Sequence, residues 1–131
     1  VLEFLLHSGR TLPQALTMLV PEPWEQDAAM GQKLKDYYEY QSCLMEAWDG
    51  PAFIGFTDGT RVGAILDRNG LRPGRYWVTC DGHVIMASEA GVLDRKPEEI
   101  ALKGRLSPGR IFMVDTADGS IVPDRTLRRY I

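Results

Sequence analysis

The stretch Asp67-Arg68-Asn69-Gly70-Leu71-Arg72-Pro73-Gly74-Arg75 is the most distinctive local sequence of the chain, and apolar runs lie on both sides of it. Its Asn-Gly pair is typical of a tight turn, because glycine adopts positive φ without steric cost. The three arginines raise the question of anion binding. However, no helix is predicted after the stretch, and the Gly-x4-Gly-Lys-Ser/Thr spacing of a phosphate loop is missing. We therefore interpret it as a strand-to-strand connection in which Asp67 pairs with a neighbouring arginine.

Short runs rich in β-branched and aromatic residues flank this connection, at positions 52–57, 61–67, 75–80, 83–88 and 110–115. Asp-Gly pairs at 58–59, 81–82 and 118–119 punctuate them, and Asp-Gly favours the tight turns of antiparallel hairpins. Residues 49–123 are therefore predicted to form mostly antiparallel sheet. Two runs, 53–56 and 84–87, are apolar without alternation, which is typical of strands covered on both faces.

The first part of the chain, residues 1–48, is predicted to be helical. An apolar stripe over residues 1–8 indicates a first helix, with Gly9 placed to end it. Thr11 is placed to cap a second helix that runs through Leu19. A third helix is predicted from about Glu25 to Trp48, because one stripe recurs at steps of three and four: Met30, Leu34, Tyr37, Gln41, Leu44 and Trp48.

Composition limits the class of protein. The chain has 131 residues, of which 44% are hydrophobic and 25% charged, as in a soluble globular domain. A formal net charge of −3 argues against a nucleic-acid partner, and the apolar runs are too short to predict a membrane span. No signal-peptide pattern is found, and two cysteines make no disulfide framework. We therefore expect a cytoplasmic setting, with neither nucleic acid nor membrane as partner.

Both ends of the sequence resemble interrupted helices. Residues 1–6 begin without an N-cap, as if a helix had started upstream. Residues 124–131 begin a helix that stops after about two turns, and isolated helices of that length are marginal. We therefore expect the chain to be a piece of a larger protein.

Few residues have the chemistry of a catalytic nucleophile. Cys43 and Cys80 have no adjacent histidine and no basic helix N-terminus to activate the thiol. We expect both to be buried or half-buried structural residues. Ser88, His83 and Asp81 have the residue types of a catalytic triad, but no Gly-x-Ser-x-Gly surrounds the serine, and chance is the better explanation.

Metal-binding and charged clusters give no site either. His7, His83 and the two cysteines lack the paired spacing of metal ligands. Glu98 and Glu99 follow a proline and are interpreted as the first turn of a helix. The basic cluster at the end of the chain is interpreted as a solvated helix face; it consists of Arg125, Arg128 and Arg129. We assign no catalytic, cofactor-binding or metal-binding residue to this chain.

Four stretches resemble one family, the glutamine amidotransferase domain of the glutamate synthase large subunit. They are Tyr-Gln-Ser-Cys-Leu-Met-Glu-Ala-Trp-Asp-Gly-Pro-Ala at 40–52, the connection at 67–76, Ala-Ser-Glu-Ala-Gly at 87–91 and Lys-Gly-Arg-Leu-Ser-Pro-Gly at 103–109. A looser Asp-Arg-x-Gly-x-Arg-Pro recurs across class II amidotransferases. Its continuation here, Pro73-Gly74-Arg75-Tyr76, favours glutamate synthase over amidophosphoribosyltransferase, asparagine synthetase and glucosamine-6-phosphate synthase.

The resemblance implies an α+β fold, part of an αββα sandwich of the N-terminal-nucleophile hydrolase type with two stacked antiparallel sheets. It implies glutamine hydrolysis at an N-terminal cysteine and transfer of ammonia to 2-oxoglutarate, with FMN, an iron–sulfur cluster and a reductant. The family's nucleophile, its substrate-binding arginine and aspartate and its oxyanion-hole Asn-Gly precede the matched part. None of them maps onto a residue of this chain, which corresponds to the C-terminal part of the domain.

The expected function is therefore structural. We expect the isolated chain to be inactive and to bind neither FMN nor a cluster. Its expected partners are the remaining domains of the large subunit, with a reductase small subunit or ferredoxin serving the parent enzyme. Two alternatives remain open: a non-catalytic interaction module with the amidotransferase fold, and a fragment of another class II amidotransferase.

Overall fold

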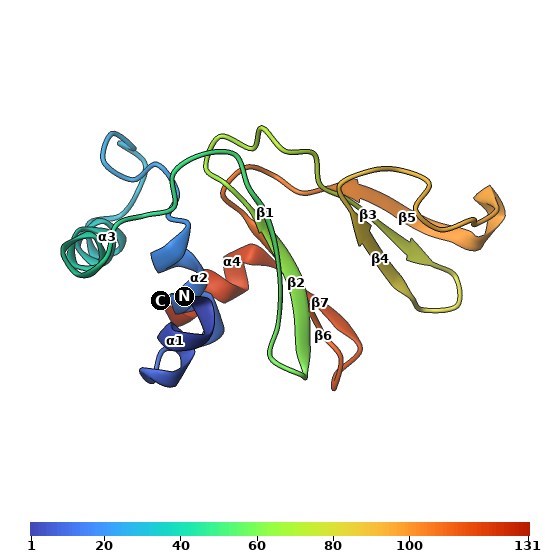
Figure 1. The fold of residues 1–131 in the computed structure, drawn as a ribbon, viewed down its shortest axis with the longest axis horizontal. Helices are drawn as coiled ribbons and strands as arrows, with labels where there is room; N and C mark the ends of the chain where they lie inside the picture. The colour runs from blue at the N-terminus through green and yellow to red at the C-terminus, as the bar shows by residue number, and fades with distance from the viewer.

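The structure is a computed structural model that describes the backbone of residues 1–131 and every side chain except that of Tyr130. Helices gather at one end, a four-stranded sheet lies in the middle, and a three-stranded sheet forms the other end (Figure 1). The two termini lie close together among the helices (Figure 1). The elements are α1 (Leu2–His7), α2 (Leu12–Leu19), α3 (Gln32–Leu44), β1 (Phe53–Thr57), β2 (Arg61–Leu66), β3 (Arg75–Thr79), β4 (Val84–Ala87), η1 (Pro97–Glu99), β5 (Ile100–Arg105), β6 (Ile111–Asp115), β7 (Ser120–Val122), α4 (Asp124–Leu127) and η2 (Arg128–Tyr130).

Helices α1 and α2 form where the sequence predicts them. Gly9 follows α1 with a φ of 91°, a left-handed conformation that glycine adopts at low cost. Thr11 caps α2 in a capping box: its hydroxyl accepts a hydrogen bond from the Gln14 N–H at 3.4 Å, and the Gln14 side chain accepts one from the Thr11 N–H at 3.0 Å. One face of α2 is almost fully buried, so this short helix is held mainly by packing.

Helix α3 is shorter than predicted, and the prediction of a helix from Glu25 to Trp48 is wrong at both ends. Asp27 accepts a hydrogen bond from the Ala29 N–H at 2.8 Å, a local turn that competes with helix formation. At the other end, the Trp48 N–H donates to the Leu19 carbonyl at 2.8 Å and draws the chain onto α2. The predicted stripe is also partly wrong, because Trp48 is 48% exposed.

The four-stranded sheet, which we call sheet A, has the order β1-β2-β6-β7, and all its pairs are antiparallel. The hairpins predicted at 58–59 and 118–119 are confirmed, with Gly59 at φ 92° and Gly119 at φ 64°. Sheet A is the layer on which the helices pack.

Sheet A is covered on both faces at one end, as the apolar run at 53–56 predicts. One face packs against α2 and α4 in a core made of Leu12, Leu16, Val20, Phe56, Ile65, Ile111, Met113 and Leu127. The opposite face contributes Phe53, Ala64, Leu66 and Phe112 to a second cluster. The alternation follows from the strand period of two, since Ala64 and Ile65 are adjacent and point to opposite faces.

The three-stranded sheet, which we call sheet B, has the order β4-β3-β5 and is also antiparallel. The hairpin predicted at 81–82 is confirmed, with Gly82 at φ 85°. Strand β5 was not predicted. The helix expected at Glu98 and Glu99 is a single 3-10 turn, after which Ile100 adopts extended backbone and the chain pairs with β3.

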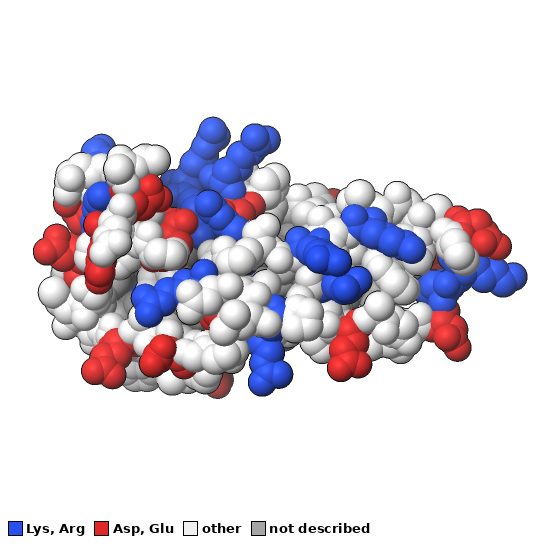
Figure 2. Space-filling view, turned by 90° about the horizontal axis from the view of Figure 1, so that it is seen from above, with Lys and Arg blue, Asp and Glu red and all other residues white. Residues whose placement is uncertain are grey.

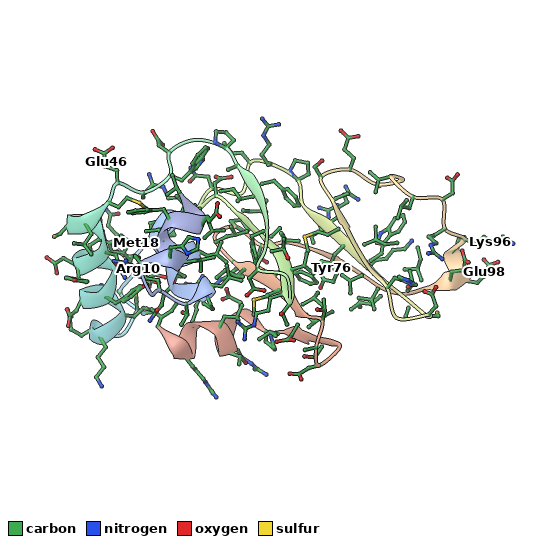
Figure 3. The ribbon with its side chains drawn as sticks, turned by 60° about the horizontal axis from the view of Figure 1, so that its bottom comes forward. Arg10, Met18, Glu46, Tyr76, Lys96 and Glu98 are labelled. Atoms are coloured by element: carbon green, nitrogen blue, oxygen red, sulfur yellow. The ribbon has the colours of Figure 1, made fainter. Side chains whose placement is uncertain are left out.

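The two sheets meet through a small apolar junction. The rings of Tyr76 and Phe112 lie 4.3 Å apart between centroids, and Met86 and Leu106 pack beside them. Tyr76 lies where sheet B approaches sheet A, whereas Lys96 and Glu98 lie at the far end of the molecule (Figure 3). Sheet B therefore covers only the near end of sheet A.

The arrangement confirms the predicted fold class, a mixed α+β structure built on antiparallel sheets with its helices gathered beside one of them. Among the described residues, no helix has both the length and the apolar character that a bilayer crossing requires.

Gly63 tests the packing of sheet A. A Cβ at this position would overlap the Phe112 carbonyl oxygen and lie 2.7 Å from the Phe56 ring. Gly63→Ala is therefore expected to lower the free energy of unfolding by about 2 kcal/mol or more, measured by urea denaturation. Gly55→Ala is the matched control, because nothing lies within 4 Å of its Cβ. Equal destabilisation by both substitutions would contradict the packing described.

Candidate functional site

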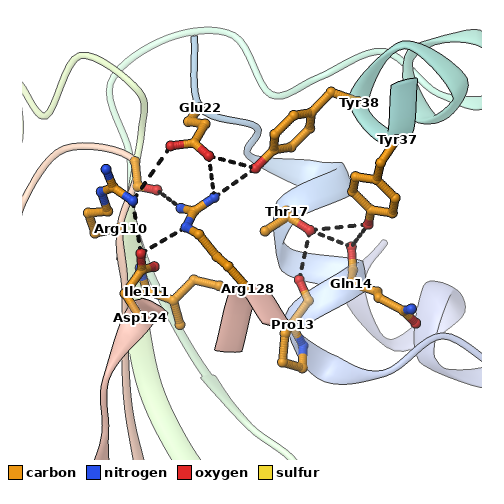
Figure 4. A network of polar contacts seen from close by, with 11 residues as sticks. Pro13, Gln14, Thr17, Glu22, Tyr37, Tyr38, Arg110, Ile111, Asp124 and Arg128 are labelled. Carbon is orange, nitrogen blue, oxygen red and sulfur yellow. Dashed lines mark hydrogen bonds and ion pairs between the residues drawn. The ribbon is translucent and has the colours of Figure 1, made fainter. Parts of the chain in front are cut away.

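Arg128 lies at the centre of the most extensive polar network among the described side chains (Figure 4). Its guanidinium donates to Asp124 at 2.8 Å, to Glu22 and to the Tyr38 hydroxyl at 2.7 Å each, and to the Gly109 carbonyl at 2.8 Å. The side chain is only 10% exposed. The network therefore joins the end of the chain to the segment after α2, to α3 and to the turn before β6.

The charges of this network balance. Glu22 and Asp124 are the two carboxylates, and Arg110 contacts both of them, at 3.6 Å and 3.0 Å. Asp124 also accepts a hydrogen bond from the Ile111 N–H at 2.9 Å. A buried arginine is costly unless each N–H finds an acceptor, and here the acceptors come from four separate parts of the chain.

The network changes the protonation equilibria of its members. Burial alone would raise the pKa of Asp124, but hydrogen bonds from Arg128 and the Ile111 N–H outweigh it and hold the pKa below its ordinary value. Burial likewise opposes the charge on Arg128, yet the bond to Asp124 and the neighbouring acidic groups raise its pKa. Burial is also the main cause of the raised pKa of Tyr38, and the charge of Glu22 adds to it.

The interpretation of the C-terminal basic cluster as a solvated face is wrong for Arg128. Arg125 and Arg129 are exposed, but Arg128 is turned inward. Local sequence gave no signal for this, because Glu22 and Arg128 are 106 residues apart. The nearest local cue is Asp124, four residues before Arg128, a spacing that places the two on one side of a helix.

A cavity of about 240 Å³ lies beside the network, between the segment after α2 and helix α3. Glu22 and Tyr38 form part of its wall, together with Trp24, Arg68 and Gln41. The Gln41 side chain is 7% exposed, and its Oε1 has no hydrogen-bond partner among the described residues. This acceptor is free to bind a water molecule or a small donor at the wall of the cavity.

Asp67 holds the connection at 67–75 together through backbone hydrogen bonds. Asp67 is 3% exposed, and its carboxylate accepts hydrogen bonds from the N–H groups of Ala52, Asn69 and Gly70 at 3.0–3.1 Å. The predicted turn is confirmed, with Gly70 at φ 61°. The predicted pairing of Asp67 with an arginine is wrong, because these amides take up the carboxylate oxygens.

The structure separates the members of the suggested triad. Asp81 and His83 are neighbours at the β3–β4 turn, with His83 Nδ1 3.1 Å from the Asp81 carboxylate. Hydrogen bonds with Thr79 and His83 lower the pKa of Asp81 to about 2. Ser88 follows the far end of β4, roughly 16 Å along the strand from His83. These residues therefore do not form a catalytic triad.

The predicted burial of the two thiols is wrong. Cys43 and Cys80 are both exposed and both free. Cys43 lies on α3, whereas Cys80 follows β3 and contacts the Glu98 carbonyl oxygen at 3.6 Å. His7 lies on α1 and pairs with Glu3, so it does not meet the other suggested ligands. Among the described residues, no three His, Cys, Asp or Glu side chains are grouped closely enough to hold a metal ion.

The fold and its amidotransferase-like motifs agree with a comparison against protein families. The profile of the glutamine amidotransferases class-II matches residues 1–131, the whole chain. The chain therefore belongs to the class-II glutamine amidotransferases. Its helices and antiparallel sheets agree with the N-terminal-nucleophile hydrolase type of fold that this family implies.

Within that family the similar proteins are glutamate synthases. The chain is 46% identical over 129 residues to the glutamate synthase [NADPH] large chain of Bacillus subtilis, covering 98% of this chain and 8% of that protein. It is 47% identical to the glutamate synthase [NADH] of Schizosaccharomyces pombe, covering 100% of this chain and 6% of that protein. It is 44% identical to the ferredoxin-dependent glutamate synthase of Antithamnion sp., covering 100% of this chain and 9% of that protein. The chain thus spans less than a tenth of each of these relatives.

Arg128→Met tests whether the network holds the fold together. The substitution removes the buried cation of the network and leaves Glu22 and Asp124 with only the more exposed Arg110 as a shared cation. We expect the free energy of unfolding at neutral pH to fall by about 3 kcal/mol. Arg125→Met, three residues earlier in the chain but exposed, is the control and is expected to change stability by less than about 0.5 kcal/mol. Similar urea midpoints for the two variants would rule out a central role for Arg128.

The lowered pKa of Asp124 predicts a dependence of stability on pH. A carboxyl group whose pKa is lower in the folded state stabilises the fold at pH values above the pKa of the unfolded group, about 3.9. This contribution is lost as the pH falls toward the lower pKa of the folded state. Asp124→Asn is therefore expected to cost about 2 kcal/mol at neutral pH and progressively less below about pH 4. Urea denaturation across this pH range measures the difference, and Asp118→Asn, at an exposed turn, serves as control. A cost that stays constant with pH would contradict the assignment.

Proposed function

We propose that this chain is the C-terminal part of the glutamine amidotransferase domain of a glutamate synthase. The parent enzyme would hydrolyse glutamine and transfer the ammonia to 2-oxoglutarate to form glutamate. The observation that carries this proposal is the 46% identity to a glutamate synthase large chain over 98% of the chain. The family profile across all 131 residues supports the same amidotransferase assignment. The alternative of an independent interaction module is not favoured by these matches.

The proposed role of this part is to hold the framework of the domain rather than to react with substrate. The polar groups buried in it are used internally: Arg128 joins four parts of the chain, and Asp67 binds the backbone of its own turn. The nucleophilic cysteine, the oxyanion-hole groups and the substrate-binding side chains would belong to the part of the family domain that precedes this segment. Cys43 and Cys80 would have no catalytic role.

The cofactors proposed for the parent would be held outside this segment. Iron–sulfur clusters are held mainly by cysteine thiolates, typically four, and this sequence contains two cysteines, on separate elements. The segment therefore does not supply a cluster site by itself. FMN and the cluster would transfer electrons in other domains of the large subunit, and those domains are the proposed partners of this chain. The expected cytoplasmic setting stays a prediction.

The choice of electron donor is also proposed to depend on other domains. The identities to NADPH, NADH and ferredoxin-dependent glutamate synthases are 46%, 47% and 44%, which is nearly the same in all three groups. A segment that determined the donor would be more similar to one group than to the others.

A segment exchange tests the proposal. Residues 1–131 replace the matching segment of the Bacillus subtilis glutamate synthase large chain, and glutamate formation from 2-oxoglutarate is measured with glutamine or with ammonium as nitrogen source. We expect the glutamine-dependent rate to stay within about tenfold of the parent, because the framework is preserved. Arg128→Met in the same chimera is expected to reduce the glutamine-dependent rate far more than the ammonium-dependent rate.

The controls separate folding from function. Arg125→Met in the chimera is expected to behave like the unmodified chimera, and the isolated 131-residue chain is expected to release no glutamate from glutamine. A chimera that folds and uses ammonium but not glutamine would refute the proposed role. Glutamate release by the isolated chain would show that a nucleophile lies within it.

A further inference from the structure

The cavity between the segment after α2 and helix α3 is bounded by wall segments that hold one another in place. Its lining residues fall between Thr17 and Arg68 in the sequence. The hydroxyls of Thr17 and Tyr37 lie 3.2 Å apart and join α2 to α3. The Trp48 N–H donates to the Leu19 carbonyl at 2.8 Å and fastens the segment after α3 to α2. The shape of the cavity therefore depends on contacts between its own walls.

The volume of this cavity limits what can occupy it. A space of about 240 Å³ far exceeds the roughly 10–15 Å³ needed to hold one water molecule. It is smaller than the roughly 300–1,000 Å³ of pockets that hold drug-sized ligands. The cavity therefore suits a small metabolite.

The wall offers one buried acceptor and one cation that are not engaged. Gln41 is 7% exposed, and its Oε1 accepts no hydrogen bond from the described residues. Arg68 is exposed and takes part in none of the ion pairs formed by the described side chains. Glu22, in contrast, is already paired with Arg128 and Arg110. A ligand that fits these two open positions carries both a hydrogen-bond donor and an anionic group.

The remainder of the wall combines charges of both signs with apolar side chains. Glu22, Glu25 and Arg68 are its charged members. Figure 2 shows acidic side chains on the helical end of the molecule beside a group of Lys and Arg side chains. The Trp24 ring stacks on Tyr38, with 6.4 Å between the ring centroids. The apolar members are Met18, Pro21, Pro23, Trp24, Met45 and Ala47. This wall favours a ligand that carries both charges on a small apolar body.

We propose that this cavity binds a free α-amino acid with an apolar side chain. Its carboxylate would pair with Arg68, because a guanidinium matches the two oxygens of a carboxylate. Its ammonium group would donate to Gln41 Oε1 after rotation of the terminal amide, a torsion whose energy wells are broad. The apolar side chain of the ligand would contact Trp24 and Met45.

The two open positions select this class of ligand over simpler occupants. Water molecules would satisfy Gln41 but would leave Arg68 without a counter-charge. An inorganic anion without a hydrogen atom would neutralise Arg68, but it has no donor for Gln41 Oε1. A zwitterion supplies both groups and adds no net charge.

Binding is measured by equilibrium dialysis of radiolabelled L-leucine against the full-length protein that contains residues 1–131. We expect saturable binding of L-leucine. L-Leucinamide lacks the carboxylate and isocaproate lacks the ammonium group, so both are expected to compete at least about tenfold more weakly than L-leucine. Amide hydrogen exchange is expected to show new protection in the wall segments, residues 17–26 and 38–47. Neither measurement requires enzymatic activity, so failure of this inference is distinguishable from failure of the proposed function.

Three variants test the assigned contacts. Gln41→Leu and Arg68→Gln are each expected to weaken the binding of L-leucine at least about tenfold. Arg68→Gln is expected to leave the affinity for L-leucinamide nearly unchanged, because that ligand has no carboxylate to lose. Arg72→Gln is the matched control: Arg72 is an exposed arginine of the same connection but does not line the cavity, so the affinity is expected to stay nearly the same.

Several outcomes would overturn the proposal. They are the absence of L-leucine binding, equal affinity for L-leucinamide, protection that appears only outside the wall segments, and an equal loss of affinity in Arg72→Gln and Arg68→Gln. The ligand analogues act on the unmodified protein, and Arg68 is exposed, so the test is decisive even if Gln41→Leu fails to fold.

Discussion

The guanidinium of Arg128 is the point on which the packing of helices against sheet A depends. Its acceptors belong to α4, to the segment after α2, to α3 and to the turn before β6, so one side chain fixes the relative positions of four parts of the chain. A buried cation tolerates no missing acceptor, because each unpaired N–H would cost free energy without access to water. The positions of Glu22, Tyr38 and Asp124 are therefore coupled: displacement of any one of them leaves a charge or a hydroxyl unsatisfied.

The second constraint is the connection between the sheets. Asp67 closes the turn after β2 through three backbone amides, and Tyr76 then covers Gly104 and meets Phe112. This arrangement gives the arginine-rich connection a structural explanation that needs no bound anion. It also agrees with the assignment of the chain to the class-II glutamine amidotransferases, in a segment whose family-like motifs hold strands together.

Local rules predicted those elements whose causes are local. The Asp-Gly pairs predicted all three hairpins, because glycine adopts positive φ at little energetic cost. Thr11 predicted the start of α2, because its capping partner is three residues away. Strand β5 was not predicted, because three of its residues, Ala101, Lys103 and Gly104, have little preference for extended backbone. It is a strand because β3 offers it a ladder to join. Cys43 and Cys80 were assigned to the interior on residue type alone, which does not determine exposure.

The sequence by itself determined the fold class, the hairpins and, through motifs spread over the whole chain, the family. The tertiary structure decided which charges are buried. Arg125, Arg128 and Arg129 share one residue type and one short segment. Among the described side chains, Arg128 alone of the three meets partners, because Glu22 and Tyr38 reach it from 90 to 106 residues away. It also decided that Asp67 binds backbone amides and that β5 pairs with β3 in sheet B. Such contacts join residues that are distant along the chain, and no local pattern encodes their distances.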